Sequence, residues 1–334
     1  MQSMESTWQG WDICQVVITV VLGFLVAHYI YVRYTMNRIR SIELDDSTVE
    51  QEGFANQGGG EGQGGAQGGA QDKDIVVLSN NHLFDAFYAK VYDQVVDGAV
   101  REQTEVGMTL GWAKTFRPEA SMLQILDVGS GTGGAVDKMR KEGAAKVVGL
   151  DSSDAMVAHS RKTYPKSDYR VGDVEQMGLF AAGEFNLVTM FYFTIYYLRD
   201  RTAAFKNMYQ WLQPGGCLVL HGVNREKFDP ILEAASPFVA FSVQKYSKER
   251  VTKSKVVFDK FTYEADFQHE GGNAEFREEF KFKNGKVRRQ VHTMRMPTME
   301  ELVAEAEQSG FVFKQFIDLT GIGYEYQYLF CFVR

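Results

Sequence analysis

The segment that most constrains the fold is the glycine-rich run at residues 126–134, with the sequence Leu-Asp-Val-Gly-Ser-Gly-Thr-Gly-Gly. It follows an apolar stretch at 122–126 that is typical of a buried strand, and it leads into a segment with helical periodicity. Glycines let the main chain approach a ligand closely, and the first amides of the next helix stay free to donate hydrogen bonds. The run therefore predicts a strand–turn–helix unit that binds a nucleotide-like ligand. Gly129, Gly131 and Gly134 also fit the dinucleotide pattern G-x-G-x-x-G, so the run alone leaves the ligand open.

Acidic residues near the ends of three apolar runs narrow the choice of ligand. Asp127 lies two residues before the first glycine, where a carboxylate repels a pyrophosphate but suits a ligand that carries an ammonium and a sulfonium. Asp151 ends the run 147–150 and is placed to accept ribose hydroxyls, while Asp173 follows the short strand predicted from Tyr169 and can accept an adenine amino group. These positions favour S-adenosylmethionine over a nicotinamide cofactor. The alternative for Asp151 and Asp173 is a plain helix N-cap.

A Pro-Gly-Gly turn at 214–216 then precedes an apolar strand at 217–220. With its glycine loop, ribose acid, Gly-Asp pair and Pro-Gly-Gly turn in this order, the chain resembles the class I, seven-stranded S-adenosylmethionine-dependent methyltransferases over residues 80–334. The resemblance implies an α/β fold, a doubly wound, mostly parallel seven-stranded sheet with an antiparallel last strand, and S-adenosyl-L-methionine as cofactor. The cofactor-binding residues that it implies are Tyr88, Tyr92, Asp127, Gly129, Ser130, Gly131, Thr132, Gly133, Asp151, Ser152, Met156, Asp173, Val174 and Phe191.

Helical and extended patterns alternate along this part of the chain, as a parallel sheet requires. Predicted helices cover 81–96, 103–115, 136–142, 155–163 and 203–211, and the apolar segment 185–193 reads as a strand buried on both faces. Thr298 and Glu301 form a capping-box pattern at the start of a further helix, which Gly310 ends. The segments 311–319 and 326–333 are predicted to form the closing antiparallel strand pair.

Between these parts the hydrophobic pattern changes to a period of two over 256–268, 274–283 and 286–296. Turn residues separate the three segments, and Asn284-Gly285 is a strong hairpin signal. The pattern predicts an antiparallel β-meander inserted at about 253–296. The resemblance to small-molecule methyltransferases of the glycine, sarcosine and sugar-amine types implies that this insertion covers the substrate.

Two residues are candidates for catalysis. His292 falls where the sugar-amine enzymes carry a histidine, which implies a group able to take a proton from an ammonium nucleophile; a structural histidine on a strand is the alternative. Tyr192 belongs to the run 185–198, which resembles the fourth strand and following loop of those enzymes. Tyr196-Tyr197 stands where many relatives have histidines, and because of this departure the resemblance leaves the substrate class open. For Tyr88 and Tyr92, simple packing within a helix is the alternative.

The N-terminal part has a different character. Residues 13–32 carry no formal charge apart from a possible charge on His28, and this length spans a bilayer as a helix. Because the arginines lie in 33–40 while acids precede the span, we expect a single-pass anchor after a 12-residue tail, with the catalytic domain facing the cytosol. A signal peptide and a buried helix are the alternatives. The Gly/Gln-rich segment 41–74 contains too little apolar surface to fold and is predicted to be a disordered linker.

Charge and cysteine content exclude some classes of protein. The formal net charge of -7 argues against a duplex nucleic acid as partner, and the three cysteines show no metal-ligand spacing or disulfide framework. The sequence thus predicts a membrane-anchored methyltransferase that acts on nitrogen or oxygen of a small molecule. Two alternatives stay open: a methyltransferase for a membrane-associated protein or RNA, and a non-catalytic module that binds S-adenosylmethionine.

Overall fold

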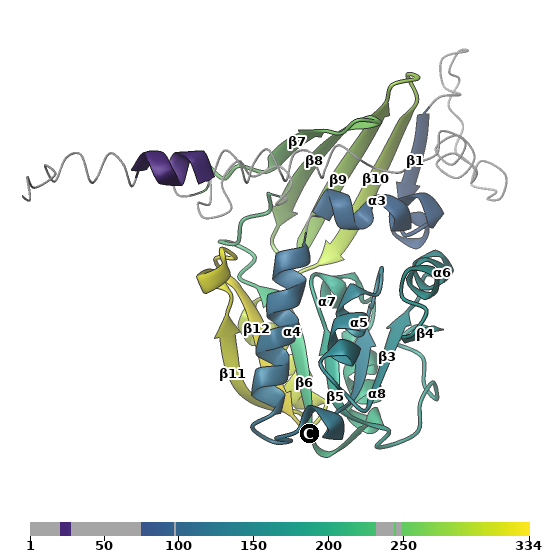
Figure 1. Ribbon diagram of the computed structural model, residues 1–334, viewed down its shortest axis with the longest axis vertical. Helices are drawn as coiled ribbons and strands as arrows, with labels where there is room; N and C mark the ends of the chain where they lie inside the picture. The colour runs from purple at the N-terminus through teal and green to yellow at the C-terminus, as the bar shows by residue number, and fades with distance from the viewer. Residues whose placement is uncertain (1–20, 28–74, 97, 232–243, 245–248) are drawn as a thin grey trace, which may run out of the picture. The chain divides into compact units, whose positions relative to one another are not determined.

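A computed structural model describes residues 21–27, 75–96, 98–231, 244 and 249–334 (Figure 1). The chain divides into two units, Met1–Glu43 and Leu44–Arg334, and in the first only residues 21–27 are described, as a helix. No helix within the described ranges combines the length and apolar character that a bilayer span needs. Most of the predicted anchor at 13–32 and all of the predicted linker at 41–74 lie outside the described residues, so both stay predictions.

The second unit is built on a seven-stranded sheet. Its order is β11-β12-β6-β5-β2-β3-β4, with β12 antiparallel to both neighbours and the other pairs of the central part parallel. The strands are β2 (Gln124–Val128), β3 (Lys146–Asp151), β4 (Asp168–Val171), β5 (Phe185–Met190), β6 (Leu212–Val223), β11 (Val312–Asp318) and β12 (Gln327–Val333). This confirms the predicted α/β sheet and its antiparallel closing pair.

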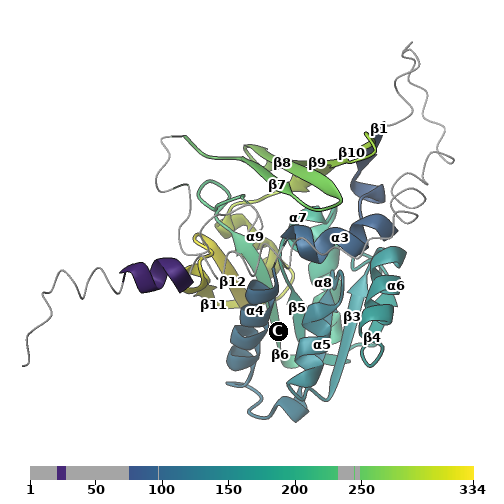
Figure 2. The same cartoon turned by 45° about the horizontal axis from the view of Figure 1, so that its top comes forward.

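Helices cover both faces of this sheet (Figure 2). They are α4 (Ala99–Ala113), α5 (Gly134–Lys141), α6 (Asp154–Thr163), α8 (Arg201–Trp211) and α9 (Met299–Gln308). Since successive strand residues point to opposite faces, Leu126 packs in a core with Phe205 of α8, whereas its neighbour Ile125 packs in a second core with Val136 of α5. The sheet is therefore doubly wound, as predicted.

Above the carboxyl ends of the parallel strands lies a second sheet, here called the lid sheet, with the order β1-β10-β9-β8-β7. Its strands are β1 (Ile75–Ser79), β7 (Lys253–Val257), β8 (Phe261–Glu270), β9 (Asn273–Phe282) and β10 (Val287–Arg295). The meander β7–β10 is antiparallel as predicted, and Gly285 makes its last turn with φ 87°. One prediction needs correction: the segment 256–268 is not one strand but parts of two. Strand β1 is not among the predicted elements; it joins the sheet parallel to β10, and nothing in its four apolar residues indicates so distant a partner.

The remaining elements lie in the connections between strands and helices. They are α3 (Ala86–Val96), α7 (Thr194–Tyr197) and the short 3-10 helices η3 (Asn80–His82), η4 (Ala120–Met122) and η7 (Thr320–Ile322). Phe87 of α3 contacts the rings of Phe280 and Phe282 in β9, at centroid distances of 5.4 and 5.7 Å. At the start of α9 the capping box between Thr298 and Glu301 is formed as predicted.

Candidate active site

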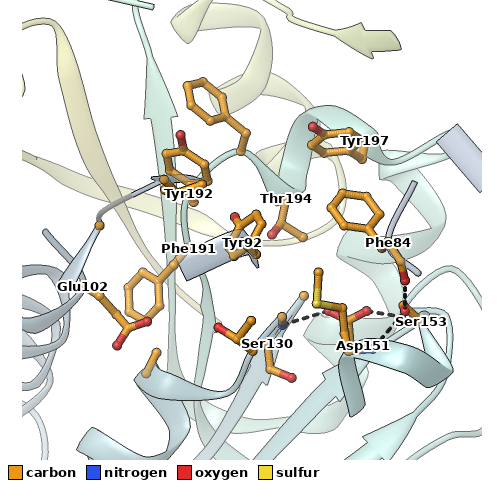
Figure 3. Close-up of a pocket in the computed structure, with 18 of the residues that line it drawn as sticks. Phe84, Tyr92, Glu102, Ser130, Asp151, Ser153, Phe191, Tyr192, Thr194 and Tyr197 are labelled. Carbon is orange, nitrogen blue, oxygen red and sulfur yellow. Dashed lines mark hydrogen bonds between the residues drawn. The ribbon is translucent and has the colours of Figure 1, made fainter. Parts of the chain in front are cut away.

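A cavity of about 1300 Å³ lies where the carboxyl ends of the strands face the lid sheet (Figure 3). Open α/β sheets bind ligands at this edge. All predicted site residues line the cavity except Gly133: they are Tyr88, Tyr92, Asp127, Gly129, Ser130, Gly131, Thr132, Asp151, Ser152, Met156, Asp173, Val174, Phe191, Tyr192 and His292. Gly133 is required by the turn instead, because its φ is 89° and a Cβ there would lie 2.7 Å from the Tyr169 ring.

The glycine loop leaves room beside its backbone. Gly129 and Gly131 both have positive φ, at 70° and 52°. A Cβ on Gly129 would lie 2.3 Å from Thr194 Cγ2, whereas a Cβ on Gly131 would meet nothing within 4 Å. The buried Ser130 Oγ has no hydrogen-bond partner among the described residues. An open backbone and an unpartnered hydroxyl on one turn are what a closely held ligand needs.

Negative charge is concentrated next to this loop. Asp127 is 2% exposed and accepts a hydrogen bond from Thr189 Oγ1 at 2.6 Å. Burial raises the pKa of Asp127 to about 7; the bond from Thr189 opposes this rise, and the nearby acids Glu102, Asp151 and Glu105 add to it. The cluster repels a pyrophosphate and attracts a cation. It therefore fits the sulfonium and ammonium of S-adenosylmethionine.

Asp151 stands at the end of β3, opposite the glycine loop. Its carboxylate accepts hydrogen bonds from the amides of Gly131 at 2.8 Å and Ser153 at 2.9 Å. Burial raises the pKa of Asp151, while these two bonds oppose the rise. Each oxygen keeps a lone pair for a hydroxyl group such as those of a ribose. The N-cap of α6 is Ser153, so the alternative that Asp151 is merely a cap is wrong.

The lid sheet contributes a line of buried polar side chains. Arg288, Gln290 and His292 alternate along β10 and all point inward, because strand residues two apart share a face. Arg288 donates to both carboxylate oxygens of Asp85, at 2.8 and 3.0 Å, and its Nε donates to Gln290 Oε1 at 2.5 Å. This fixes the Gln290 amide so that its Nε2 donates to Glu278 of β9 at 2.9 Å.

Glu278 is the centre of this group and is 2% exposed. Its Oε1 accepts from the hydroxyls of Tyr88 at 3.0 Å and Tyr263 at 2.6 Å, and its Oε2 lies 2.5 Å from His292 Nε2. Burial would raise the pKa of Glu278, but the hydrogen bonds from His292, Tyr263 and Tyr88, together with the charge of His292 whenever that ring is protonated, outweigh burial and lower it. Glu278 is therefore a carboxylate that holds His292 in place.

The other nitrogen of His292 faces the strand–helix connection after β5. His292 Nδ1 and the Tyr197 hydroxyl lie 2.7 Å apart. The rings of Tyr197 and His292 contact each other edge to face, with centroids 5.9 Å apart, and Phe84 contacts both. Tyr197 lines the cavity together with His292 and Glu278, and it is the most exposed of the three (Figure 3).

A second polar group lies at the β6 side of the cavity. Tyr192 has φ 52°, a rare angle for a tyrosine, and the Arg101 guanidinium of α4 lies 3.8 Å from the centroid of its ring. Below it, Glu105 Oε1 lies 3.3 Å from Nδ1 of the fully buried His221. Burial, together with the charge of Arg101, lowers the pKa of His221 to about 3, so this histidine is neutral at pH 7.

Sequence reasoning missed several lining residues, notably Glu278, Tyr197 and Arg101. For Glu278 a signal was present: the inward positions of β9 are Ala274, Phe276, Glu278, Phe280 and Phe282, and one acid on an apolar face marks a partnered site. Tyr197 belongs to the Tyr196-Tyr197 pair that stands where many relatives have histidines, but the sequence does not show which of the two reaches the site. Arg101 carries no comparable signal, since its position depends on how α4 packs.

Comparison with known proteins agrees with this geometry. Residues 125–216 match the family described as "Methyltransferase domain". The chain is 35% identical over 138 residues to the dTDP-4-amino-2,3,4,6-tetradeoxy-D-glucose N,N-dimethyltransferase of Saccharopolyspora spinosa. This match covers 40% of this chain and 53% of that protein. It is 31% identical over 144 residues to a demethylmenaquinone methyltransferase of Chlorobaculum parvum, covering 43% and 56%. The chain thus spans about half the length of these curated relatives.

Solved structures share the fold over a longer stretch. The S-adenosylmethionine-bound amino pentose methyltransferase CalS10 of Micromonospora echinaspora superposes with a TM-score of 0.51 at 24% identity, covering 70% of this chain and 91% of that one. The sugar N-methyltransferase KedS8 of a Streptoalloteichus species gives a TM-score of 0.54 at 20% identity, covering 82% and 97%. With its strand order, its glycine loop and its cluster of acids, the second unit of this chain has the fold of the class I methyltransferases, and residues 125–216 within it match the methyltransferase domain family.

Proposed function

We propose that this protein is an enzyme that transfers a methyl group from S-adenosylmethionine to the amino nitrogen of a small molecule. The observation that carries the proposal is that one cavity joins the glycine loop and its acids to the polar group of Glu278, His292 and Tyr197. Asp127, Asp151 and the Ser130 hydroxyl, unpartnered within the described residues, would hold the cofactor, which supplies an electrophilic methyl group. Alignment of the acceptor with that methyl then accounts for most of the rate.

The charge of the cavity wall favours an amine over an acceptor that bears phosphates. Every lysine or arginine among the described lining residues lies within 4 Å of a carboxylate: Lys138 of Glu102 at 2.7 Å, Arg199 of Asp173 at 3.4 Å and Arg101 of Glu105 at 3.7 Å. Acids line the wall in larger number. Two sequence relatives carry N,N-dimethyltransferase names for amino sugars, which supports nitrogen as the target.

A second candidate is methyl transfer to the oxygen of a phenol or quinol. The observation in its favour is the aromatic part of the cavity wall, which includes Phe84, Phe193, Phe228, Phe267 and Phe276. Relatives from Xanthomonas carry the name ubiquinone biosynthesis O-methyltransferase, at 34% and 33% identity over 113 residues. Flat aromatic rings would pack well against such a wall.

The test incubates the full chain with S-adenosylmethionine labelled in its methyl group. The acceptors are amino sugars without phosphate, the corresponding hydroxy sugars, and hydroquinones, with the Gly131→Val variant as the inactive control. Label on the amines alone is expected. Label on the hydroquinones alone would favour the second candidate, and label only on added protein or RNA would favour a macromolecular substrate. Cofactor binding in calorimetry without any transfer would indicate a non-catalytic module.

We also propose that residues 13–32 anchor the protein in a membrane with the catalytic domain on the cytosolic side. The support is the uncharged length of this segment and the arginines that follow it. The full chain should sediment with membranes and resist carbonate extraction, whereas a chain beginning near Asp74 should stay in the supernatant. Release of the full chain by carbonate would refute the anchor without affecting the proposed reaction.

A further inference from the structure

We propose that Glu278, His292 and Tyr197 form a proton relay in which the Tyr197 hydroxyl, and not the imidazole, contacts the acceptor amine and takes its proton. The inference rests on the proposed function and adds a catalytic residue to it. Its basis is the order of the contacts: carboxylate to Nε2 at 2.5 Å, and Nδ1 to hydroxyl at 2.7 Å.

An acceptor has little access to the nitrogens of His292. The side chain is buried, and each ring nitrogen has a partner within hydrogen-bond distance. An acceptor could reach a ring nitrogen only by displacing Glu278 or Tyr197. Glu278 is fixed by three further donors, Tyr88, Tyr263 and Gln290. All three residues line the cavity, but Glu278 and His292 are each 2% exposed whereas Tyr197 is only half-buried, so its hydroxyl is the part of the relay that is most open to an acceptor.

The partners of His292 determine where its protons lie. A carboxylate can only accept, so His292 Nε2 must carry a proton and donate it to Glu278. In the neutral ring Nδ1 is then an acceptor, and the Tyr197 hydroxyl donates to it. This arrangement has the logic of an acid–base triad, in which a buried carboxylate fixes the tautomer and stabilises the imidazolium once it forms.

The surroundings of Tyr197 disfavour a negative charge on its oxygen. Burial raises the pKa of Tyr197 well above 10, and the nearby groups Tyr92, Glu278 and Tyr192 raise it further. A lasting phenolate is therefore disfavoured, and Tyr197 must pass a proton on as it receives one. The groups that face the relay are Tyr88 and Tyr92 from α3, Glu278 from β9, Tyr263 from β8 and Tyr192 from the connection after β5.

The proton transfer and the methyl transfer together conserve atoms and electrons. The acceptor enters as an ammonium, and its N–H bond breaks and leaves the electron pair on nitrogen. That proton binds Tyr197 Oη while the original hydroxyl proton moves to His292 Nδ1, which gives an imidazolium beside the Glu278 carboxylate. The freed nitrogen lone pair forms the N–CH₃ bond, and the electron pair of the broken C–S bond stays on sulfur. After product release the imidazolium returns its Nδ1 proton to Tyr197 Oη while the Tyr197 hydroxyl passes a proton to water in the cavity.

The test compares Tyr197→Phe with Tyr196→Phe, two removals of one hydroxyl from adjacent residues of α7. The Tyr196 hydroxyl accepts from the Val223 amide at 2.8 Å and does not line the cavity. For amine acceptors at pH 7, we expect Tyr197→Phe to lower kcat roughly 100-fold, within the range for general acid–base catalysis. Affinity for S-adenosylmethionine should stay within about threefold. Tyr196→Phe should lose stability but keep kcat.

The pH profile separates chemistry from structure. The Tyr197→Phe defect should shrink as the pH rises toward the pKa of the acceptor amine, because solvent then removes the proton. A defect that is constant with pH, or equal rates for the two variants, would overturn the relay while leaving the proposed function standing. Absence of transfer to any amine by the wild type would instead refute the proposed function and the relay with it.

A measurement without turnover gives an independent answer. In ¹⁵N-histidine NMR of the wild type, neutral His292 should carry its proton on Nε2. Tyr197→Phe should shift the Nδ1 resonance because the hydrogen bond is lost, and Tyr196→Phe should not. A neutral ring protonated on Nδ1, or an Nδ1 signal that ignores Tyr197→Phe, would contradict the proton positions on which the relay depends.

Discussion

Replacing Glu278 by Gln changes the charge at the centre of the lid sheet with little change in volume. The carboxylate accepts four hydrogen bonds, from Tyr88, Tyr263, Gln290 and His292. The amide oxygen of a glutamine can still accept the two bonds from Gln290 and His292, but the acceptor is then neutral. The amide NH₂ group would face the two tyrosine hydroxyls, which must turn in order to accept from it. Hydrogen bonds to charged groups contribute about 1.5–3 kcal/mol and neutral ones about 0.5–1.5 kcal/mol. The amide also removes the cost of burying a charge, which offsets part of this effect. We therefore expect a net loss of about 2–3 kcal/mol in the free energy of unfolding at pH 7.

The pH dependence has a definite sign. Since the pKa of Glu278 is lowered in the folded state, its stabilising effect is present above the unfolded value near 4.5 and is lost as the pH falls through the folded pKa. The difference between wild type and Glu278→Gln should therefore be largest near neutral pH and shrink below pH 4.5.

The assay is urea unfolding of the full chain followed by tryptophan fluorescence at pH 7 and at about pH 3.5. Glu264→Gln is the matched control, because Glu264 lies on β8 of the same sheet but on the solvent face, paired with Lys255 at 2.8 Å and Lys281 at 2.7 Å. An exposed pair of this kind contributes less than about 1 kcal/mol. If the two variants agree within about 0.5 kcal/mol at pH 7, the reasoning about Glu278 is refuted.

Four further outcomes are expected. Gly131→Val should abolish binding of S-adenosylmethionine in calorimetry, because the new side chain fills open space beside the loop and strains a φ of 52°; unchanged affinity would contradict the role of the loop. Asp151→Ala should weaken that binding by roughly 2–3 kcal/mol, and a loss below about threefold would argue against the ribose role. Cofactor affinity should fall as the pH drops below about 7, where Asp127 becomes protonated, and Asp127→Asn should remove this dependence; a wild-type affinity that is flat from pH 6 to 8 would count against it. Thr298→Ala should cost about 1 kcal/mol by removing the capping box of α9, as measured by urea unfolding, with cofactor affinity unchanged.

Local chemistry made several features predictable from the chain. A glycine loop after an apolar strand needs no distant partner to be recognised, and the same holds for acids at strand ends and for the capping box at Thr298. The strand β1 shows the opposite case. Its partner in the lid sheet, β10, begins at Val287, more than 200 positions later, and no local pattern encodes that pairing.

The residues of the candidate site also fall into a group set by local sequence and a group set by contacts between distant segments. The residues around the glycine loop are contiguous or follow successive strands, so their meeting at one edge of the sheet follows from parallel topology. His292 was recognisable as a candidate, but its role depends on Glu278 from another strand and Tyr197 from α7. Whether a histidine acts as a base or is held between partners is a question of distances between segments.

The sequence by itself therefore determined the strand–turn–helix order, the cofactor class and the presence of a period-two insertion, because each depends on neighbours within a few residues. Only the tertiary structure decided how the lid sheet closes over the cavity, that Glu278 is the acid that holds His292, and that Tyr197 lines the cavity beside them. These contacts join residues 14 and 95 positions apart, and their geometry is set by the packing of whole elements, which no short window of sequence contains.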